Sequence, residues 1–392
     1  MTKKLRIGVF GASRGFGLMN VLNKMEEAEI VAVLEQRADK VERVKSNFPE
    51  AKIVNTFEEL LDCGLDAVIL ANFFPEHAKY AIQALKKDVS VFSETIPAVT
   101  LKECAELTEA AEASKGIYML AENYPFSRGA MEVARVYQTG ALGKVIFAEG
   151  EYVHPLSKKT KAAIAPTPDH WRNHLPRTYY MTHSMMPLVL ATGLLPKKVI
   201  GKIASKPTDD GGLEDGVGII LTEMEGGAVF RCSGSCSFGP EGNWYRLGCE
   251  KGGIETVRGD INKVRLSYNS YELTDENREH GTDCTYSPAI SEIGKQALST
   301  GHSGGDYWVT WHFIQALLGN EEPVIDVYKA VSVAAAGILA WRSALENSKQ
   351  MDIPDFKNQA DREKAKLDDL NPFAVDGKEP DLPCRYYGEV VV

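Results

Sequence analysis

The chain lacks several features that mark common protein classes. None of its apolar runs approaches the ~20 residues that a membrane-spanning helix needs. It has no basic block, and its formal net charge of −10 argues against nucleic acid or an anionic membrane as a partner. The N-terminus has no signal-peptide core. Its seven cysteines are scattered without metal-ribbon spacing, which favours reduced thiols in the cytoplasm.

The first thirty-five residues contain the most informative pattern. A buried-type strand, Leu5–Phe10, precedes a glycine-rich stretch, and a helical stretch follows from about Leu18 to Met25. A second apolar run, Glu29–Leu34, then ends on Glu35. Glycines let the backbone approach a pyrophosphate, a helix N-terminus offers N–H groups, and an acid accepts from ribose hydroxyls. This order predicts a dinucleotide-binding crossover.

The glycine loop departs from the standard G-x-G-x-x-G pattern, because Ser13 stands where the second glycine is usual. A tight turn without nucleotide is therefore the alternative. Glu35 favours NAD by repelling a 2′-phosphate, whereas Arg37 is placed to hold one. We predict NAD as the cofactor. The loop residues predicted to bind it are Gly11, Ser13, Arg14, Gly15, Phe16 and Gly17.

Strands and helices continue to alternate after Glu35, which predicts a doubly wound parallel sheet in an α/β domain over residues 1–125. Thr100 and Glu103 form a capping-box pattern that starts one of these helices. The expected strands are Ala51–Val54, Asp66–Ala71, Val89–Glu94 and Tyr118–Ala121. Helices are expected over Lys40–Asn47, from Thr56, over His77–Leu85, and from Thr100 to about Ala113.

The pattern changes after a helix at Gly129–Gln138, because strand-like runs then follow without intervening helices. We expect a C-terminal α+β domain over residues 126–355, built on a large open antiparallel sheet, and a polar tail over 356–392. The stretch Leu156–Pro176 has no clear period. The strand-like runs are Val145–His154, Val199–Ala204, Val217–Thr222, Ala228–Phe238, Tyr245–Cys249 and Lys263–Tyr268. Later helices are expected over Asp306–Leu318 and Tyr328–Leu345.

These features resemble the glucose–fructose oxidoreductase / inositol dehydrogenase (Gfo/Idh/MocA) family over about residues 5–355. The run Asp66–Ala71, the following Pro75-Glu76-His77 and the strand ending on Glu94 carry the likeness. The resemblance implies an N-terminal Rossmann domain and NAD(P)-dependent chemistry on sugars or cyclitols. It also implies a homodimer or homotetramer formed through the C-terminal sheet, whose open face would expose a large apolar surface.

Two departures from the family dehydrogenases bear on the chemistry. Glu-Lys-Pro is usual after that strand, but this chain has Glu94-Thr95-Ile96-Pro97, so Thr95 stands at the lysine position. His183 matches the active-site histidine, and Tyr179 stands where an aspartate is usual. An alcohol-dehydrogenase mechanism that uses Lys and Asp is therefore not expected.

A narrower resemblance accounts for these departures. The chain is similar to the NAD-dependent α-N-acetylgalactosaminidase branch, whose enzymes oxidise C3 of the sugar, eliminate the C1 group, add water and reduce C3 again. By motif, Tyr180 and His183 fall on the Tyr-x-x-His site, while Glu122, Tyr152 and His154 fall on sugar-binding positions. The matching motifs are Glu122-Asn123-Tyr124, Gly150–His154, His170-Trp171-Arg172, Tyr180–His183, Gly301–Tyr307 and Asp326-Val327-Tyr328.

The resemblance implies an unusual division of catalytic work. Tyr180 and His183 would serve C3 and C2 in either order, and Tyr152 or His154 would assist the leaving group. A C3 ketone makes the C2 proton acidic, so such a site can omit the carboxylate pair of ordinary glycosidases. The alternative is that the tyrosines are packing aromatics and that His183 is a helix N-terminal residue.

Other polar residues have a functional and a structural interpretation. His170 and His174 are four apart, but nearby prolines argue against the helix that a shared metal ion needs, and we predict no metal. Capping of a helix is the first explanation for Asp306. Further residues predicted to bind cofactor are Asn72, His77, Glu94 and Asn123, and those predicted to bind substrate are Glu122, Trp171, Arg172 and His302.

We therefore predict a cytoplasmic NAD(H)-dependent oxidoreductase that acts on a sugar or glycoside by hydride transfer at a ring hydroxyl, at C3. The alternative is a redox-neutral NAD-dependent glycosidase or lyase, which keeps its cofactor bound and which the missing lysine favours. A third alternative, of another class, is a nucleotide-binding regulatory protein without catalysis.

Overall fold

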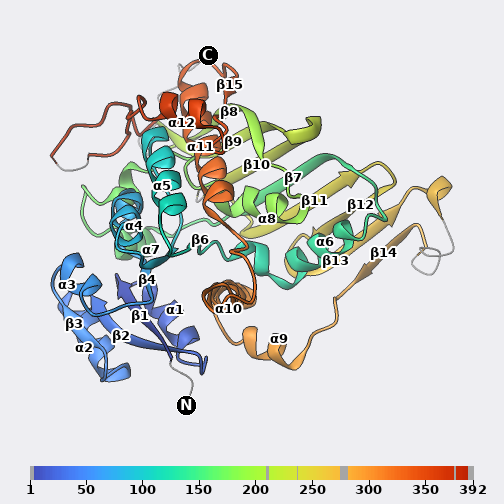
Figure 1. Ribbon diagram of the computed structural model, residues 1–392. Coiled ribbons are helices and arrows are strands. Elements are labelled where there is room, and N and C mark those ends of the chain that lie inside the picture. Colours follow the sequence, from blue (N-terminus) through green and yellow to red (C-terminus); the bar gives the residue numbers. More distant parts are fainter. Residues whose placement is uncertain (1–3, 209–211, 236, 274–280, 375–376, 387–392) are drawn as a thin grey trace. The chain divides into compact units, whose positions relative to one another are not determined.

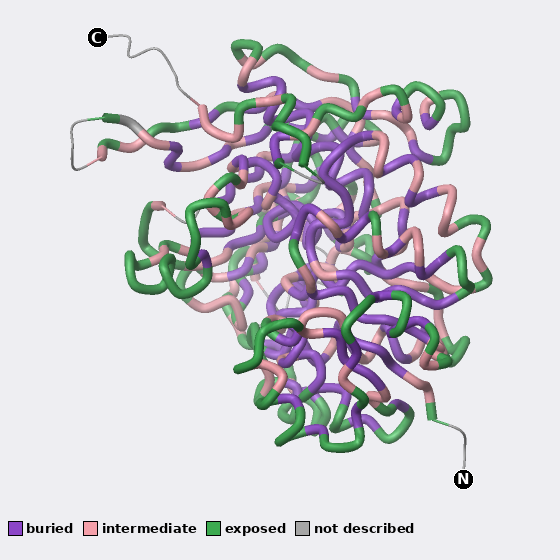
Figure 2. Tube along the Cα trace, turned by 90° about the vertical axis from the view of Figure 1, so that its left-hand side faces the viewer, coloured by how far each residue is buried: buried purple, intermediate pink, exposed green. Residues whose placement is uncertain are grey.

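Two compact units make up the protein in the computed structural model, which describes residues 4–208, 212–235, 237–273, 281–374 and 377–386 (Figure 1). Unit 1 combines residues 1–123, 292–331 and 356–369, and unit 2 combines residues 124–291, 332–355 and 370–392. In Figure 2, buried stretches of the trace gather in its interior, and many of the outer loops are exposed.

Six parallel strands form the sheet of unit 1, in the order β3-β2-β1-β4-β5-β6. The strand order reverses direction between β1 and β4, and nucleotides bind at such a switch point, outside the carboxyl ends of the strands. The predicted doubly wound sheet is confirmed. The strands are β1 (Leu5–Phe10), β2 (Ala28–Leu34), β3 (Lys52–Val54), β4 (Ala67–Leu70), β5 (Ser90–Ser93) and β6 (Tyr118–Leu120).

Five helices connect these strands, and α5 shows how local sequence sets their limits. Thr100 accepts a hydrogen bond from the backbone N–H of Glu103, and the Glu103 carboxylate accepts from the N–H of Thr100. The predicted capping box is thus confirmed. The helices are α1 (Gly15–Leu22), α2 (Ala38–Asn47), α3 (Phe57–Leu61), α4 (His77–Leu85) and α5 (Leu101–Ala113).

Unit 1 also contains segments from much later in the chain, which the sequence interpretation did not foresee. Helices α9 (Glu292–Ala297) and α10 (Gly305–Leu317) belong to it, and α10 packs against α1. Helix α12 (Gln359–Ala365) packs against α5, and Phe356 just before it is 1% exposed. The structure therefore differs from the predicted contiguous domains and separate polar tail, because scattered apolar residues anchor residues 356–369.

Unit 2 contains a nine-stranded sheet in the order β14-β13-β12-β11-β7-β10-β9-β8-β15. The predicted large antiparallel sheet is confirmed, and within it one pair of strands, β10 and β7, is parallel. The strands are β7 (Val145–Val153), β8 (Pro196–Pro207), β9 (Leu213–Met224), β10 (Val229–Ser235), β11 (Gly242–Cys249), β12 (Gly252–Val257), β13 (Asp260–Tyr268), β14 (Asp283–Tyr286) and β15 (Met351–Asp352).

Helices α6 (Arg128–Gln138) and α8 (Thr182–Thr192), with most of α11 (Val327–Leu345), pack in unit 2. A Cβ on Gly150 of β7 would lie 1.9 Å from the carbonyl oxygen of Ser184, so α8 approaches the sheet backbone directly. The stretch without period, Leu156–Pro176, contains a short helix α7 (Lys158–Ile164) and the 3₁₀ turn η3 (Trp171–His174). Ser157 caps α7 by accepting from the N–H of Thr160.

Candidate functional site

The glycine loop of unit 1 has the backbone that close approach to a phosphate requires. Gly11 follows β1 with φ +89°, and a Cβ there would lie 2.4 Å from the carbonyl oxygen of Ala71. Gly15 begins α1, so the helix N-terminus follows the loop directly. The dipole and the N–H groups of a helix N-terminus suit an anion.

Not every predicted loop residue offers its side chain to a ligand. Ser13 is exposed, but Phe16 is 5% exposed and packs edge-on against Phe48 with ring centroids 5.7 Å apart. Phe16 therefore has only its backbone left for a cofactor. The closest neighbour of a Cβ on Gly17 would be an Arg14 guanidinium nitrogen, at 3.2 Å.

Glu35 ends β2 and holds the loop from the other side. One carboxylate oxygen accepts from the N–H of Ala12 at 2.8 Å, and the other accepts from the N–H groups of Gln36 and Arg37 at 2.9 Å each. The side chain of Arg37 turns to Asp39, which it contacts at 3.1 Å. A carboxylate at this end of β2 suits the ribose of NAD.

Polar residues that follow β4 and β6 retain unused hydrogen-bonding capacity. The Oδ1 atoms of Asn72 and Asn123 are buried without a hydrogen-bond partner in the described part of the chain. Buried polar atoms ordinarily have partners, so such acceptors mark places where a ligand group fits. Together with the Gly11 turn and Glu35, these two asparagines fit a dinucleotide. NAD bound here would supply a hydride acceptor.

His77 begins α4 and is almost completely buried, at 2% exposure. Burial lowers the pKa of its imidazole to about 4, although its contacts with backbone carbonyls oppose the shift. One of these contacts joins Nδ1 to the carbonyl oxygen of Ile96 at 2.9 Å. His77 is therefore a neutral hydrogen-bond donor at physiological pH.

A pH-dependent contribution to stability follows from His77. The folded pKa lies below the unfolded value near 6.5, so the unfolded chain binds the extra proton between these values. We expect up to roughly 3 kcal/mol of stability to be lost as pH falls from 6.5 to 4. Urea unfolding of His77→Asn, which keeps a donor, should show a flatter pH profile than wild type. An unchanged slope in H77N would contradict the assignment.

Asp306 organises a buried ionic cluster in unit 1. Its carboxylate accepts two hydrogen bonds from Arg14, at 2.7 and 3.0 Å, and one from Asn123 at 2.8 Å. His302 Nδ1 lies 3.1 Å from both oxygens. Burial raises the pKa of Asp306, but hydrogen bonds from His302 and Arg14 outweigh it and hold that pKa well below its usual range. Asp306 is thus ionised.

This cluster corrects the capping role predicted for Asp306. Helix α10 begins after Gly304, with no side-chain cap, and Asp306 bonds instead to side chains elsewhere in unit 1. The predicted substrate residue His302 has its Nδ1 engaged here, with 38% of its side chain exposed. Spacing within the motif gave no signal of this role.

Glu94 lies on the other side of Arg14, 2.7 Å from its Nε. Burial raises the pKa of Glu94, Arg14 opposes the shift, and Asp306 and Glu122 add to it. Glu122 follows β6 in unit 1 and is fully buried, so the structure places it in this acidic surrounding. Arg14 therefore stands among several carboxylates.

Three of the four predicted catalytic residues, Tyr152, Tyr180 and His183, lie together in unit 2. The ring centroid of His183 lies 4.5 Å from that of Tyr180 and 4.6 Å from those of Tyr152 and Tyr124. His183 and Tyr152 are each 7% exposed, and Tyr180 is partly exposed. Phenols and an imidazole at these distances can exchange protons with a bound hydroxyl. Tyr124 was not among the predicted catalytic residues, although it stood in a matching motif.

The strands and helix of unit 2 fix this aromatic cluster. Tyr152 lies on β7, and His183 lies in the first turn of α8. The hydroxyl of Tyr245 on β11 donates to the backbone carbonyl of His183 at 2.9 Å. The buried hydrogen bond from the Tyr245 hydroxyl and the close contact at Gly150 thus hold the start of α8 against the sheet.

His154 and the η3 turn lie in more exposed parts of unit 2. His154 Nδ1 is 2.7 Å from a carboxylate oxygen of Glu241, and 44% of its side chain is exposed. The ring of His154 is 6.0 Å from that of Tyr152. In η3, the Arg172 guanidinium lies 4.4 Å over the Trp171 ring, a cation–π contact.

The two positions that depart from the family dehydrogenases differ in surroundings. Tyr179, at the aspartate position, is 1% exposed and packs edge-on against Phe373 with centroids 6.0 Å apart. Its ring therefore belongs to the core of unit 2. Thr95, at the lysine position, is buried in unit 1 beside Glu94. Neither side chain carries the charge that Lys and Asp would supply.

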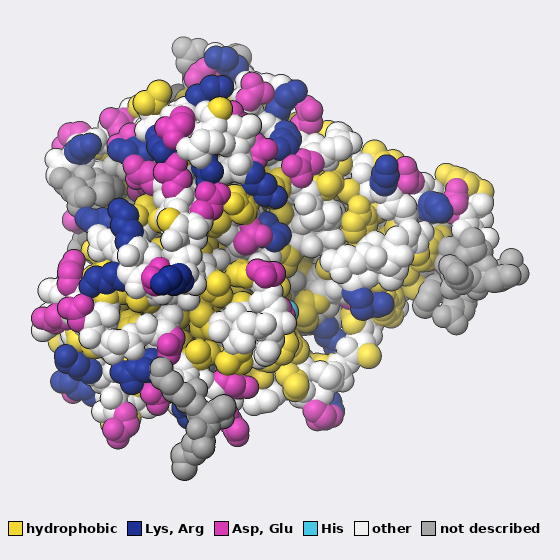
Figure 3. All heavy atoms as spheres, viewed as in Figure 1, with side chains coloured by type: hydrophobic (Ala, Val, Ile, Leu, Met, Phe, Trp, Pro, Cys, Tyr) yellow, Lys and Arg dark blue, Asp and Glu magenta, His cyan; other side chains and the backbone are white. Residues whose placement is uncertain are grey.

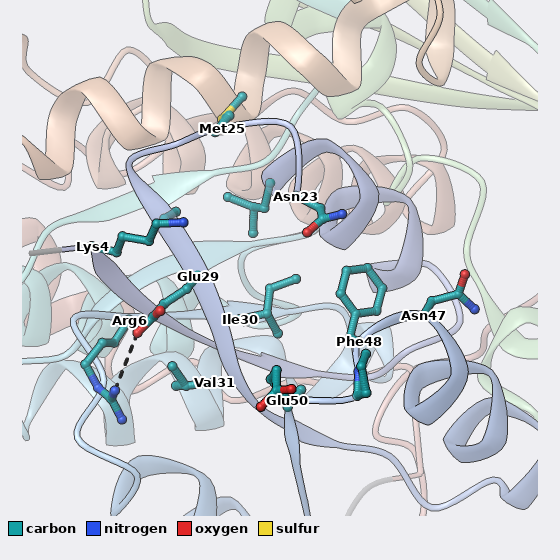
Figure 4. Close-up of a pocket in the computed structure, with 14 residues that line it drawn as sticks. Lys4, Arg6, Asn23, Met25, Glu29, Ile30, Val31, Asn47, Phe48 and Glu50 are labelled. Carbon is teal, nitrogen blue, oxygen red and sulfur yellow. Dashed lines mark ion pairs between the residues drawn. The ribbon is translucent and has the colours of Figure 1, made fainter. Parts of the chain in front are cut away.

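The remaining candidate sites do not resemble the cofactor site. His170 and His174 lie in or beside a 3₁₀ turn, and the described residues contain no group of three metal-ligating side chains. A cavity of about 510 Å³ lies at the amino ends of β1 and β2, where Arg6 and Glu29 form an ion pair (Figure 4). Nucleotides bind at the opposite ends of such strands.

The described part of the chain contains no helix long and apolar enough to cross a membrane. On the face drawn in Figure 3, acidic and basic side chains are interspersed.

Two parts of the chain match known families. Residues 5–122 match the oxidoreductase family with an NAD-binding Rossmann fold (Gfo/Idh/MocA). Residues 250–361 match the C-terminal domain of glycosyl hydrolase 109. The chain therefore combines a Gfo/Idh/MocA NAD-binding domain with a glycosyl hydrolase 109 C-terminal domain, which confirms the predicted class of NAD-dependent enzyme and its cofactor.

Individual relatives agree with this combination. A glycosyl hydrolase family 109 protein of Stenotrophomonas maltophilia is 23% identical over 430 residues, covering 96% of this chain and 93% of the relative. One from Shewanella putrefaciens is 22% identical over 400 residues, covering 91% and 86%. Levoglucosan dehydrogenase, solved with NADH and levoglucosan, has a TM-score of 0.73 at 15% identity and covers 90% of this chain and 100% of that one. The last likeness concerns the fold alone.

Proposed function

We propose that this protein is an NAD-dependent enzyme that cleaves a glycoside through a 3-keto intermediate and returns the hydride within one turnover. The observation that carries the proposal is the Tyr152–Tyr180–His183 cluster, combined with the loss of the lysine at Thr95. The glycosyl hydrolase 109 match over residues 250–361 supports cleavage. Two relatives named for that family point the same way.

The proposed chemistry needs two bases and one acid. One of Tyr180 and His183 removes the C3 hydroxyl proton as the C3 hydride leaves, and the other removes the C2 proton. The C1–oxygen bond then breaks, and Tyr152 or His154 gives a proton to the leaving alcohol. Water adds at C1, and the base that has exchanged its proton with solvent delivers a proton to C2. The hydride returns to C3, and the base that took the C3 hydroxyl proton gives a proton back to the C3 oxygen. Atoms and electrons balance without net oxidation.

The substrate residues have separate parts in this proposal. Trp171 offers an aromatic face to a sugar ring, and Arg172 offers donors to a hydroxyl or carboxylate. Glu122 and His302 remain proposed sugar-binding residues.

Isotopes distinguish this reaction from its alternatives. We expect stoichiometric NAD on denaturing the purified protein, and cleavage of aryl glycosides without added cofactor. Turnover in D₂O should place deuterium at C2 of the product, whereas deuterium at C3 of the substrate should remain there. Cleavage without exchange at C2 would exclude elimination.

Net oxidation or reduction of a sugar hydroxyl is the second candidate, favoured by the oxidoreductase match over residues 5–122. It requires NAD to be consumed in proportion to product. If neither cleavage nor NAD turnover occurs with any sugar, the third candidate, a nucleotide-binding regulatory protein, gains support.

We also propose a homodimer or homotetramer in the cytoplasm, assembled through the sheet of unit 2. Phe147, Leu221 and Val229 on its central strands are between 37% and 44% exposed. Arg231 and Arg246 both pair with Glu149 beside them. Apolar side chains framed by charges suit a second copy of the chain.

Substitution of Leu221 by Arg should dissociate this assembly, and light scattering measures the mass. An unchanged mass would contradict this interface.

A further inference from the structure

Arg14 is the only loop residue discussed above whose side chain is fixed by an acid from far along the chain. Two guanidinium nitrogens of Arg14 donate to the two oxygens of Asp306, 292 residues later, at 2.7 and 3.0 Å. Only 4% of the Asp306 side chain is exposed, and 30% of that of Arg14. A two-pronged arginine–carboxylate pair of this burial is both directional and strong.

The surrounding backbone leaves room for this pair and little else. A Cβ on Gly301 would lie 2.3 Å from an oxygen of Asp306, and one on Gly17 would lie 3.2 Å from a nitrogen of Arg14. Asn123 and His302 complete the contacts of the carboxylate. Asp306 is therefore held by Asn123 and His302 as well as by Arg14.

Arg14 lies at the start of α1, so its pairing with Asp306 affects the glycine loop. Arg14 is the N-cap residue of α1, and its backbone carbonyl accepts from the N–H of Gly17 at 3.1 Å. Its side chain also contacts Glu94 at 2.7 Å. Ionic contacts with two later segments thus restrain the turn whose N–H groups suit a pyrophosphate.

We propose that the Asp306–Arg14 pair is a positioning clamp that retains NAD by holding the phosphate loop closed. A loop already ordered loses less conformational freedom on binding, which favours affinity. Opening the loop to release the dinucleotide requires Arg14 to leave a buried carboxylate, so the clamp slows dissociation. The inference depends on NAD binding by unit 1 and is independent of the sugar reaction.

Release of labelled NAD from the full-length protein tests the clamp. The protein is loaded with radiolabelled NAD, chased with excess unlabelled NAD and sampled by rapid filtration. Asp306→Asn is expected to accelerate release by about 10- to 100-fold, the effect of removing one partner of a buried charge pair. Arg14→Met should accelerate it too, and the double variant should be no faster than the faster single variant.

Asp215→Asn is the matched control, because Asp215 is a fully buried carboxylate of unit 2 that accepts from the backbone N–H of Tyr386. It should release NAD at the wild-type rate. Circular dichroism first establishes that each variant is folded, and R14M provides the test if D306N does not fold. Release within about twofold of wild type in the folded variants, or additive effects in the double variant, would overturn the proposal.

Discussion

Substitution of Tyr180 by Phe is expected to lower kcat by about 10²- to 10⁴-fold, the usual contribution of a positioned acid or base. The substitution removes one oxygen from a ring that lies 4.5 Å from His183. Unit 1 does not contain Tyr180, so NAD content after denaturation should equal that of wild type. Steady-state kinetics on an aryl glycoside and quantification of released NAD measure the two quantities.

Tyr179→Phe is the control for this prediction, because it makes the same change one residue earlier. Tyr179 packs against Phe373 in the core of unit 2, and this contact needs only the ring. Its kcat should stay within a few-fold of wild type. Equal losses in Y179F and Y180F would indicate that the hydroxyls support structure, and an unimpaired Y180F would remove Tyr180 from the catalytic set.

Gly11→Ala is expected to weaken NAD binding by roughly 100-fold, because left-handed strain and overpacking together cost about 3 kcal/mol. A Cβ at Gly11 would lie 2.4 Å from the carbonyl oxygen of Ala71, so β1 and β4 must move apart at their carboxyl ends, where a dinucleotide is expected to bind. Isothermal titration of the cofactor-free protein with NAD measures the loss.

Gly64→Ala separates the two contributions. Gly64 also has a positive φ, +69°, but a Cβ there would meet nothing within 4 Å. G64A therefore carries the conformational strain without the collision, and its NAD affinity should match that of wild type. If G64A weakens binding as much as G11A, the loss reflects destabilisation of unit 1 rather than the loop.

The fold of unit 1 was predictable because its information is local. Alternating apolar runs and helical periods, with Thr100 and Glu103 at a helix start, report structure within about ten residues of themselves. The same reasoning located Glu35 and Gly11 at strand ends. It did not reveal that the Phe16 side chain is buried, because a buried aromatic next to a glycine turn has no distinguishing local pattern.

The candidate site of unit 2 was predictable only through motif resemblance. His183 and Tyr152 lie 31 residues apart in the sequence, and their contact depends on how α8 packs on β7. The parallel pairing of β10 with β7 and the returning segments of unit 1 are likewise set by long-range packing. The sequence around Arg14 and around Asp306 contains no pattern that indicates their pairing.

Unit 1 is built from three separate segments of the chain, and this has a consequence for its biosynthesis. A ribosome that has made the first 123 residues has produced all six strands of the dinucleotide sheet, but not Asp306, which follows 183 residues after Asn123. The nascent sheet must wait for the whole intervening stretch before α10 and α12 can join it. Contacts this distant slow folding and prolong the exposure of apolar surface. Chains that stop early would therefore be candidates for quality control, and full-length synthesis would be the step after which cofactor is held firmly.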